Sequence, residues 1–231
     1  IPGSHPPLSE AELFSFFETA VNTVLSKDLA QSDRVRKPDM FRSFLAQLAR
    51  DHGGKFAPTK IAKDLGLDAA TPTAWVELCE RMFLLRRLEA LGPGFKVLPR
   101  KADKIYVQDP GLLNYLAGGP SLAELLQSGK SGLVIEGILF DHLKRLQFNA
   151  YGGRTGVMGY IERPEADFIV QLPSMYLAIE SKFSQSPKGR QRLATEYAKQ
   201  ENVLAILVTH SSFSTQGDVW EVPAWLLLMT A

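Results

Sequence analysis

The stretch EADFIVQLPSMYLAIESKF, residues 165–183, decides the fold of this chain. Apolar and polar residues alternate towards both of its ends, which is typical of β-strands. The intervening LPSM, residues 172–175, has the composition of a turn. The stretch therefore predicts a β-hairpin, and the apolar run VLAILV at residues 203–208 predicts a further strand of the same sheet.

Three charged residues of the hairpin converge. If the turn is centred between residues 173 and 174, Asp167 lies directly opposite Glu180. The two-residue period of a strand puts Lys182 on the same face as Glu180. Facing carboxylates repel each other, so a cation is expected to compensate them, either Lys182 itself or a divalent metal with oxygen ligands. The alternative is a solvated sheet face, on which the same three residue types are common.

The pattern of Asp167 followed by Glu180-Ser181-Lys182 resembles the PD-(D/E)XK nuclease superfamily. In that superfamily the strand aspartate and the glutamate of Glu-x-Lys bind magnesium, and the lysine assists a hydrolytic water. The resemblance implies that Asp167 and Glu180 are metal ligands for Mg²⁺ or Mn²⁺ and that Lys182 is catalytic. One departure is the proline of the family name, because Pro164 lies three residues before Asp167 and not immediately before it.

A further acidic residue is expected on a helix upstream of the hairpin. Glu136 has apolar neighbours three, four and seven residues on, namely Leu139, Phe140 and Leu143. This spacing places its carboxylate on the core-directed stripe of a helix, where burial is costly without a partner. The nuclease superfamily often adds such a glutamate, so the resemblance makes Glu136 a further catalytic candidate.

The N-terminal part of the chain predicts helices followed by a hairpin. The spacing of its apolar residues predicts helices at residues 8–29, 40–49, 58–65 and 71–85. The turn LGPGF, residues 91–95, predicts two short strands on either side of it. The last three of these helices, followed by the hairpin, predict a winged helix.

Two domains are therefore expected, and the fold class is α/β, or α+β overall. The first is a helical winged-helix domain at residues 8–101, and the second is a restriction-endonuclease-like domain at residues 102–231. In the second we expect a mixed sheet with the hairpin at its centre and helices on its faces, one of them at residues 190–200.

The predicted wing is rich in cations. Six cationic side chains against Glu89 and Asp103 give it a net charge of +4; they are Arg86, Arg87, Lys96, Arg100, Lys101 and Lys104. Such a patch predicts contact with nucleic-acid phosphates. The alternatives are a solvated hairpin and a surface that docks another domain. Reading of a DNA groove is disfavoured, because Glu77 and Glu80 on the preceding helix would repel phosphates.

A wider resemblance covers roughly residues 20 to 225. Its motifs occur in order: Lys27-Asp28-Leu29, Leu84-Leu85, Lys104-Ile105-Tyr106 with Asp109 and Gly111-Leu112, the Glu136 helix, and the two hairpin strands. Together they resemble the C-terminal part of a prokaryotic family of AAA+ ATPases, in which a P-loop ATPase precedes a winged helix and a nuclease-like domain. The departures are Gln108, where that family favours an apolar or aromatic residue, and Ala166, where it favours valine.

Composition excludes some classes of protein. A net charge of +1 over 231 residues gives no global attraction to nucleic acid or membrane, and the single Cys79 excludes an internal disulfide. No apolar run approaches the ~20 residues of a membrane helix, and the start lacks a signal peptide, so a cytoplasmic protein is expected. Gly129-Lys130-Ser131 lacks the spacing of a P-loop, so nucleotide binding is not expected there and the ATPase domain is missing from this sequence.

These observations leave three functions to compare. The leading one is the C-terminal fragment of an AAA+ ATPase-like protein whose nuclease-like domain binds, and could cleave, nucleic acid with magnesium. The rival is a catalytically inactive interaction module that docks the ATPase or a protein partner. The third, a winged-helix transcription regulator, is weakened by the two acidic side chains named above.

Overall fold

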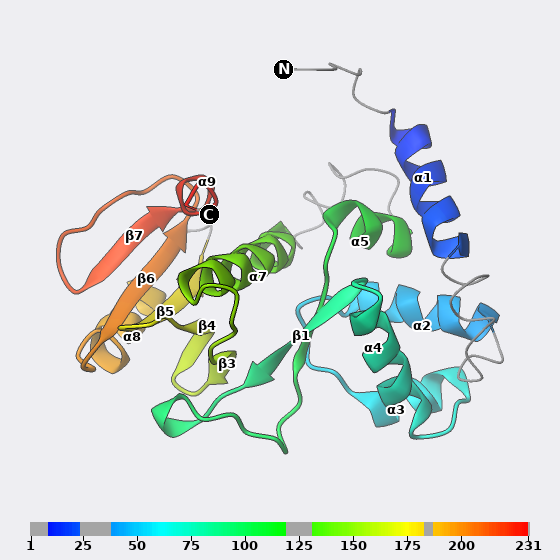
Figure 1. Ribbon diagram of the computed structural model, residues 1–231, viewed down its shortest axis with the longest axis horizontal. Helices are drawn as coiled ribbons and strands as arrows, with labels where there is room; N and C mark the ends of the chain where they lie inside the picture. Colours follow the sequence, from blue (N-terminus) through cyan, green and yellow to red (C-terminus); the bar gives the residue numbers. More distant parts are fainter. Residues whose placement is uncertain (1–8, 24–37, 119–130, 183–186, 231) are drawn as a thin grey trace. The chain divides into compact units, whose positions relative to one another are not determined.

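The computed structural model describes residues 9–23, 38–118, 131–182 and 187–230 (Figure 1). The chain divides into two compact units. Unit 1 takes residues 1–86 and 105–131, and unit 2 takes residues 87–104 and 132–231. We predicted one boundary between residues 101 and 102, whereas the units interleave along the chain.

Unit 1 is mainly helical. Its helices are α1 (Glu10–Thr23), α2 (Pro38–Arg50), α3 (Pro58–Leu65), α4 (Thr71–Arg81) and α5 (Pro110–Leu116). The apolar stripe predicted for α2 is buried, and Trp75 of α4 packs edge-on against Phe41 and Phe44 of that stripe. These aromatic contacts join α2 to α4. The predicted motif Lys27-Asp28-Leu29 and the segment 129–130 lie outside the described residues.

The predicted wing differs in detail from the observed one. The last predicted helix was wrong at its end, because α4 stops at Arg81, Phe83 adopts a left-handed φ of 57°, and strand β1 (Leu85–Ala90) begins there. After β1, residues 93–95 form a 3₁₀ turn, and one bridge joins Leu91 to Val97. The second strand, β2 (Lys104–Val107), comes later than predicted. Pro99, which has no backbone N–H, interrupts pairing in between.

The sheet is mixed and has seven strands in the order β2-β1-β3-β4-β5-β6-β7. Its remaining strands are β3 (Met158–Glu162), β4 (Glu165–Gln171), β5 (Tyr176–Ser181), β6 (Val203–Thr209) and β7 (Val219–Pro223). The pairs β3–β4 and β4–β5 are antiparallel, and β1–β3, β5–β6 and β6–β7 are parallel. Gly159 of β3 permits the close approach of β1, because a Cβ there would lie 2.4 Å from the Glu89 carbonyl oxygen. The α/β class and the mixed sheet are thus confirmed.

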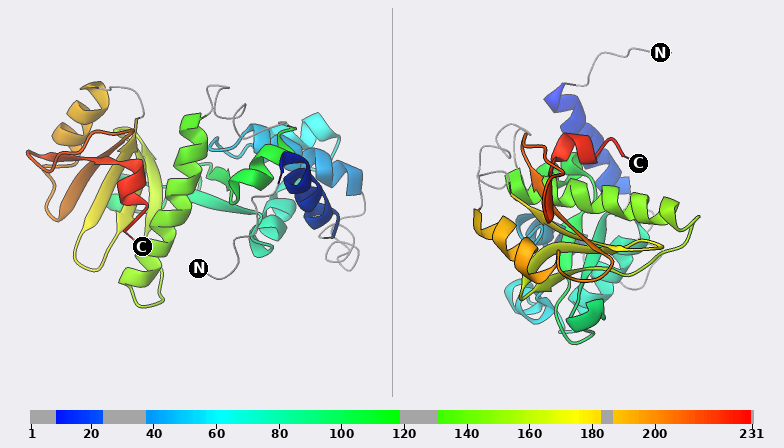
Figure 2. Two further views of the ribbon diagram at one scale, coloured as in Figure 1. Left: turned by 90° about the horizontal axis from the view of Figure 1, so that it is seen from above. Right: turned by 90° about the vertical axis from the view of Figure 1, so that its left-hand side faces the viewer.

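Helices cover both faces of the sheet in unit 2, as predicted. They are α7 (Ser131–Ala150), α8 (Pro187–Glu196) and the short α9 (Ala224–Leu227). Figures 1 and 2 show α7 on one face and α8 on the other. Phe140 of α7 stacks on Phe168 of β4, while Leu193 of α8 is buried against Ile169 and Ala178. The hairpin β4–β5 therefore lies between two packed layers.

The described helices contain no membrane-span candidate. None of them combines the length and the apolar composition that crossing a bilayer requires.

Candidate functional site

The hairpin has the predicted register. Phe168 pairs with Ile179 and Gln171 with Tyr176, so the next position along the ladder sets Asp167 opposite Glu180. Leu172 N donates to Met175 O at 2.7 Å and closes the turn. The centre of the turn thus falls between residues 173 and 174.

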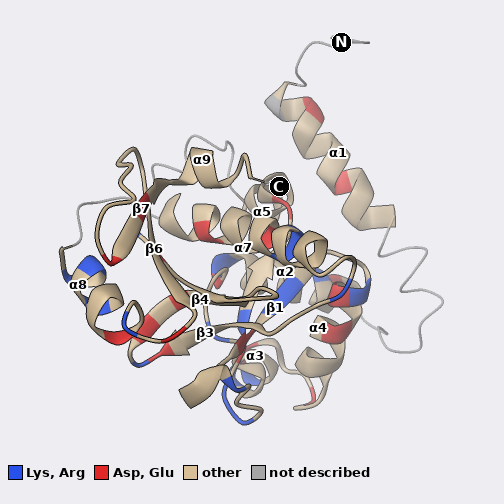
Figure 3. Cartoon of the chain, turned by 60° about the vertical axis from the view of Figure 1, so that its left-hand side comes forward, with Lys and Arg blue, Asp and Glu red and all other residues tan. Residues whose placement is uncertain are grey.

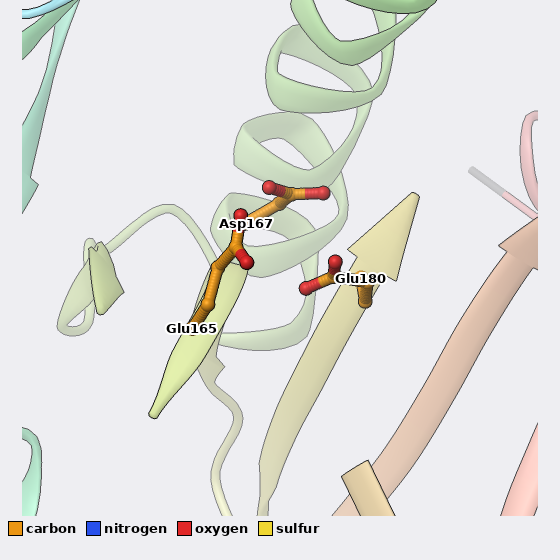
Figure 4. A group of neighbouring side chains, drawn as sticks. All are labelled: Glu165, Asp167 and Glu180. Atoms are coloured by element: carbon orange, nitrogen blue, oxygen red, sulfur yellow. The ribbon is translucent and has the colours of Figure 1, made fainter. Parts of the chain in front are cut away.

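Three carboxylates gather at this end of the hairpin. Glu165 and Asp167 of β4 and Glu180 of β5 each place an oxygen within 4.8 Å of the other two (Figure 4). We call these three residues the carboxylate cluster; among the described residues they are the group of acids placed to hold a metal ion. Asp167 is 5% exposed and Glu180 is 0% exposed, whereas Glu165 is exposed. On a solvated sheet face these acids would be exposed, so the burial of Asp167 and Glu180 argues against that alternative.

Asp167 is fixed by Ser181, the last residue of β5. Its Oδ2 accepts hydrogen bonds from Ser181 N at 2.8 Å and from Ser181 Oγ at 2.9 Å. The middle residue of the Glu-x-Lys motif therefore holds the aspartate opposite the glutamate.

Glu180 has cations on one oxygen only. Its Oε1 accepts from Arg192 Nη2 at 2.6 Å and lies 2.8 Å from Lys182 Nζ. Its Oε2 is buried and has no hydrogen-bond partner in the described structure. Burial, and then the charge of Asp167, raise the pKa of Glu180 against the opposing effects of Lys182 and Arg192. An unmatched buried carboxylate oxygen is costly, so this atom is the feature of the site that most requires an explanation.

Lys182 remains charged in this arrangement. Burial acts to lower its pKa, but the hydrogen bond to Glu180 and the negative charges of Asp167, Glu180 and Glu165 outweigh it and raise the pKa. The side chain is 34% exposed, so its ammonium reaches both the cluster and solvent.

Arg192 and the role of Glu165 were not predicted from the sequence. Arg192 Nη2 lies 3.0 Å from Glu165 Oε2, and its Nε donates to the Glu165 carbonyl at 3.1 Å. One guanidinium thus bridges Glu165 and Glu180. The strand period places Glu165 on the side of Asp167 and could have found it, whereas no motif marks Arg192.

Glu136 is buried on α7, as predicted, but it is not a member of the carboxylate cluster. Its Oε1 lies 3.0 Å from Lys104 Nζ, with side-chain exposures of 9% and 18%. Lys104 Nζ also lies 5.2 Å from the centre of the Tyr160 ring. The Tyr160 hydroxyl donates to the Ala102 carbonyl at 2.6 Å. The cost of burying Glu136 is therefore offset by a lysine.

The six cations predicted for a nucleic-acid patch are divided between the units. Arg86 belongs to unit 1 and the other five to unit 2. Three of the five are ion-paired: Arg87 with Asp103 at 3.9 Å, Lys101 with Glu162 at 3.6 Å and Lys104 with Glu136. Lys96 and Arg100 are exposed. Figure 3 shows acidic and basic residues interspersed along the chain. Phosphate contact by the wing stays a prediction.

Comparison with known proteins gives a family without an assigned activity. The model of a family described as "Domain of unknown function (DUF8612)" matches residues 2–123. The uncharacterized proteins Mb2031c of Mycobacterium bovis and Rv2008c of Mycobacterium tuberculosis are each 26% identical to the chain over 147 residues. The match covers 63% of this chain and 33% of each relative, so the chain spans about a third of the length of these curated relatives.

A solved structure is also similar over part of the chain. MepR, a transcription regulator of the Staphylococcus aureus multidrug efflux pump MepA, is 18% identical. The match covers 61% of this chain and 100% of MepR, with a TM-score of 0.26. This score is too low to relate the two folds.

Proposed function

The chain belongs to the family of the domain of unknown function DUF8612, and we propose that its unit 2 is a nuclease-like module that binds Mg²⁺ or Mn²⁺ and hydrolyses phosphodiester bonds of nucleic acid. Asp167 and Glu180 are the principal ligands in this proposal, and Glu165 is a third. Lys182 lies beside them as a catalytic cation.

The unmatched Oε2 of Glu180 carries the proposal. Hard divalent cations take carboxylate oxygens as ligands, and three such groups lie within 4.8 Å of one another. Burial and the negative charge of Asp167 raise the pKa of Glu180. The positive charge of a bound cation would stabilise the ionised carboxylate and so lower this pKa. The donor set therefore fits a hard divalent cation.

The residues of the chain divide the chemistry between them. A bound divalent cation would polarise a phosphoryl oxygen and acidify a water for attack on phosphorus. Ser181 keeps Asp167 in position through two hydrogen bonds. Because the pKa of Lys182 is raised, its ammonium is suited to orient the water and to stabilise negative charge on phosphate, and less suited to act as a base.

The proposal for the longer protein rests on the resemblance of the sequence to the C-terminal part of a family of AAA+ ATPases. We infer a longer AAA+ ATPase-like protein, of which this chain is the C-terminal part, and the length of the mycobacterial relatives beyond the matched third leaves room for such a domain. The order of α2, α3 and α4 followed by β1 and β2 supports a winged helix, the two strands of which also form one end of the seven-stranded sheet.

A second function has one observation in its favour. Arg192 and Lys182 already place two positive charges against Glu180 without a metal. If these ion pairs are the final state of the cluster, the fold serves as an interaction module that docks the ATPase or a protein partner.

Calorimetric titration with Mn²⁺ and a cleavage assay separate the two functions. The nuclease-like module should bind Mn²⁺ and cleave a single-stranded, duplex or branched substrate only with Mg²⁺ or Mn²⁺ present. Asp167→Asn should abolish both, whereas Asp68→Asn, the same change at an exposed position of unit 1, should alter neither. Absence of metal binding by the unaltered protein, with Asp167→Asn neutral or stabilising in thermal melts, would leave the interaction module.

A further inference from the structure

Unit 2 contains a cavity of about 700 Å³ beside the carboxylate cluster. One wall is a stripe of α8, made of Pro187, Arg190, Gln191 and Ala194, which have the spacing of one helix face. The other wall is built from β6, β7 and the segment that joins them. The volume of the cavity is within the range of ligand-binding pockets.

The lining of the cavity has an apolar base and a polar rim. Leu207 and Val219 are buried, and Ala194 packs partly buried beside them. The polar groups are of three kinds: the cations Lys182 and Arg190, the acids Asp218 and Glu221, and a group of hydroxyl and imidazole side chains comprising Thr209, His210, Ser211 and Ser212. The last three of these and Asp218 are exposed, so the cavity opens to solvent.

The two charged walls face each other. Arg190 Nε lies 3.3 Å from Glu221 Oε1, which joins α8 to β7 across the cavity. Positive charge therefore comes from α8 and Lys182, and negative charge comes from the β7 side. The first turn of α8 also lines the cavity and adds positive potential.

Lys182 connects the cavity to the carboxylate cluster. It is a lining residue of the cavity and also lies 2.8 Å from Glu180. On α8, Arg190 faces the cavity, while Arg192 contacts Glu165 and Glu180. A ligand in the cavity would thus lie directly next to the atoms of the proposed hydrolytic site.

We propose that this cavity is a nucleotide subsite, which holds the nucleoside adjoining the phosphodiester that the cluster cleaves. The assignment of this substrate rests on the proposed function, whereas nucleotide binding itself does not require a metal. The phosphate lies towards Lys182, the base packs on Leu207 and Val219, and the acids on the β7 side accept from base amino and sugar hydroxyl groups.

The mixed charge of the lining selects a single nucleotide unit. A run of backbone phosphates would meet Asp218 and Glu221 and be repelled. A free amino acid has both charges but is too small to occupy a cavity of about 700 Å³. A nucleotide combines one anionic end with a flat apolar body and several hydrogen-bond donors.

The test uses the full chain in EDTA, with AMP, adenosine and inorganic phosphate titrated separately and followed by calorimetry and by NMR amide shifts. AMP should bind more tightly than either fragment and should shift the amides of Gln191, Ser211 and Ser212. Ser212→Trp, which fills the mouth of the cavity, should weaken AMP at least about tenfold. Ser174→Trp, the same change at the exposed hairpin turn, should leave it unchanged.

Several results would overturn the nucleotide subsite. These are inorganic phosphate binding as tightly as AMP, AMP binding unaffected by Ser212→Trp, or a peptide that occupies the cavity while AMP does not. Asp167→Asn separates this proposal from the proposed function, because it should abolish Mn²⁺ binding and retain AMP binding. If the unaltered protein neither binds Mn²⁺ nor cleaves nucleic acid, the proposed hydrolytic function is wrong, but AMP binding in the cavity is not affected by that result.

Discussion

Two buried glutamates, one at the start of α7 and one at the end of β5, have very different surroundings. Glu136 is 7% exposed and Glu180 is 0% exposed. Glu136 Oε1 lies 3.0 Å from Lys104 Nζ, and Glu136 is not one of the three acids of the carboxylate cluster. Glu180 has two cations on one oxygen, no partner on the other, and two further carboxylates beside it. Burial of an acid therefore does not by itself mark a site; an unmatched oxygen beside other acids does.

The largest expected effect concerns metal affinity. Glu180→Gln should weaken Mn²⁺ binding by about 100-fold or more, because it removes a charged ligand. Glu136→Gln should change the affinity by less than about threefold, since its partner is Lys104. Calorimetric titration of both variants measures the difference, with the exposed Glu201→Gln as a control. Equal losses in the two variants would show that Glu136 belongs to the metal site after all.

The second effect concerns the contribution of the ion pair between Lys104 and Glu136 to the free energy of unfolding. Lys104→Met leaves a buried carboxylate without its cation and should lower the free energy of unfolding by about 2 kcal/mol. Urea denaturation measures this value. The double change of Lys104→Met with Glu136→Met should recover much of the loss, because an apolar pair carries no unmatched charge. A single variant as stable as the unaltered protein would contradict a structural role for this ion pair.

The third effect concerns Arg192, which lies against the cluster where a metal would bind. Arg192→Gln should increase Mn²⁺ affinity by about tenfold, because the incoming cation no longer has to displace a guanidinium from Glu165 and Glu180. Arg190→Gln on the neighbouring face of α8 is the matched control and should leave Mn²⁺ affinity unchanged. Weaker metal binding by Arg192→Gln would indicate that this residue supports the site and does not compete with the metal.

The smallest effect concerns His142, a buried residue of α7 whose pKa is lowered. Burial, and then the charge of Arg145, lower the pKa of His142, whose Nε2 lies 3.4 Å from Thr230 Oγ1. Because its folded-state pKa lies below the unfolded value of about 6.5, His142 favours folding above that value, and the contribution is lost as pH falls below it towards the lower folded-state pKa. The loss should be less than about 1 kcal/mol. Thermal melts across this range should show a shallower decline for His142→Gln, and an unchanged slope would contradict the assignment.

The local features of the site could be predicted from the sequence, and the long-range ones could not. The turn centre and the two-residue period are enough to place Asp167 opposite Glu180. Glu165 follows from the same period. Arg192 does not, because its direction depends on how α8 rotates when Leu193 packs on the sheet.

The wing and the Glu136 helix show the same limit. Lys104 and Glu136 were each singled out by their local pattern, but their pairing joins residues 32 positions apart and depends on the tertiary fold. The misplaced second strand was a local error, since Pro99 marks the position where strand pairing stops.

The interleaving of the two units affects how genes for such proteins can be rearranged. Glu89 and Ala90 of β1 supply the partner strand for Gly159 and Tyr160 of β3. A fragment that begins at residue 105 or 132 would encode unit 2 without this strand and would leave the edge of β3 open to aggregation. A contiguous fragment that holds all of unit 2 therefore has to begin at residue 87 or earlier, and it carries residues 105–131 of unit 1 with it.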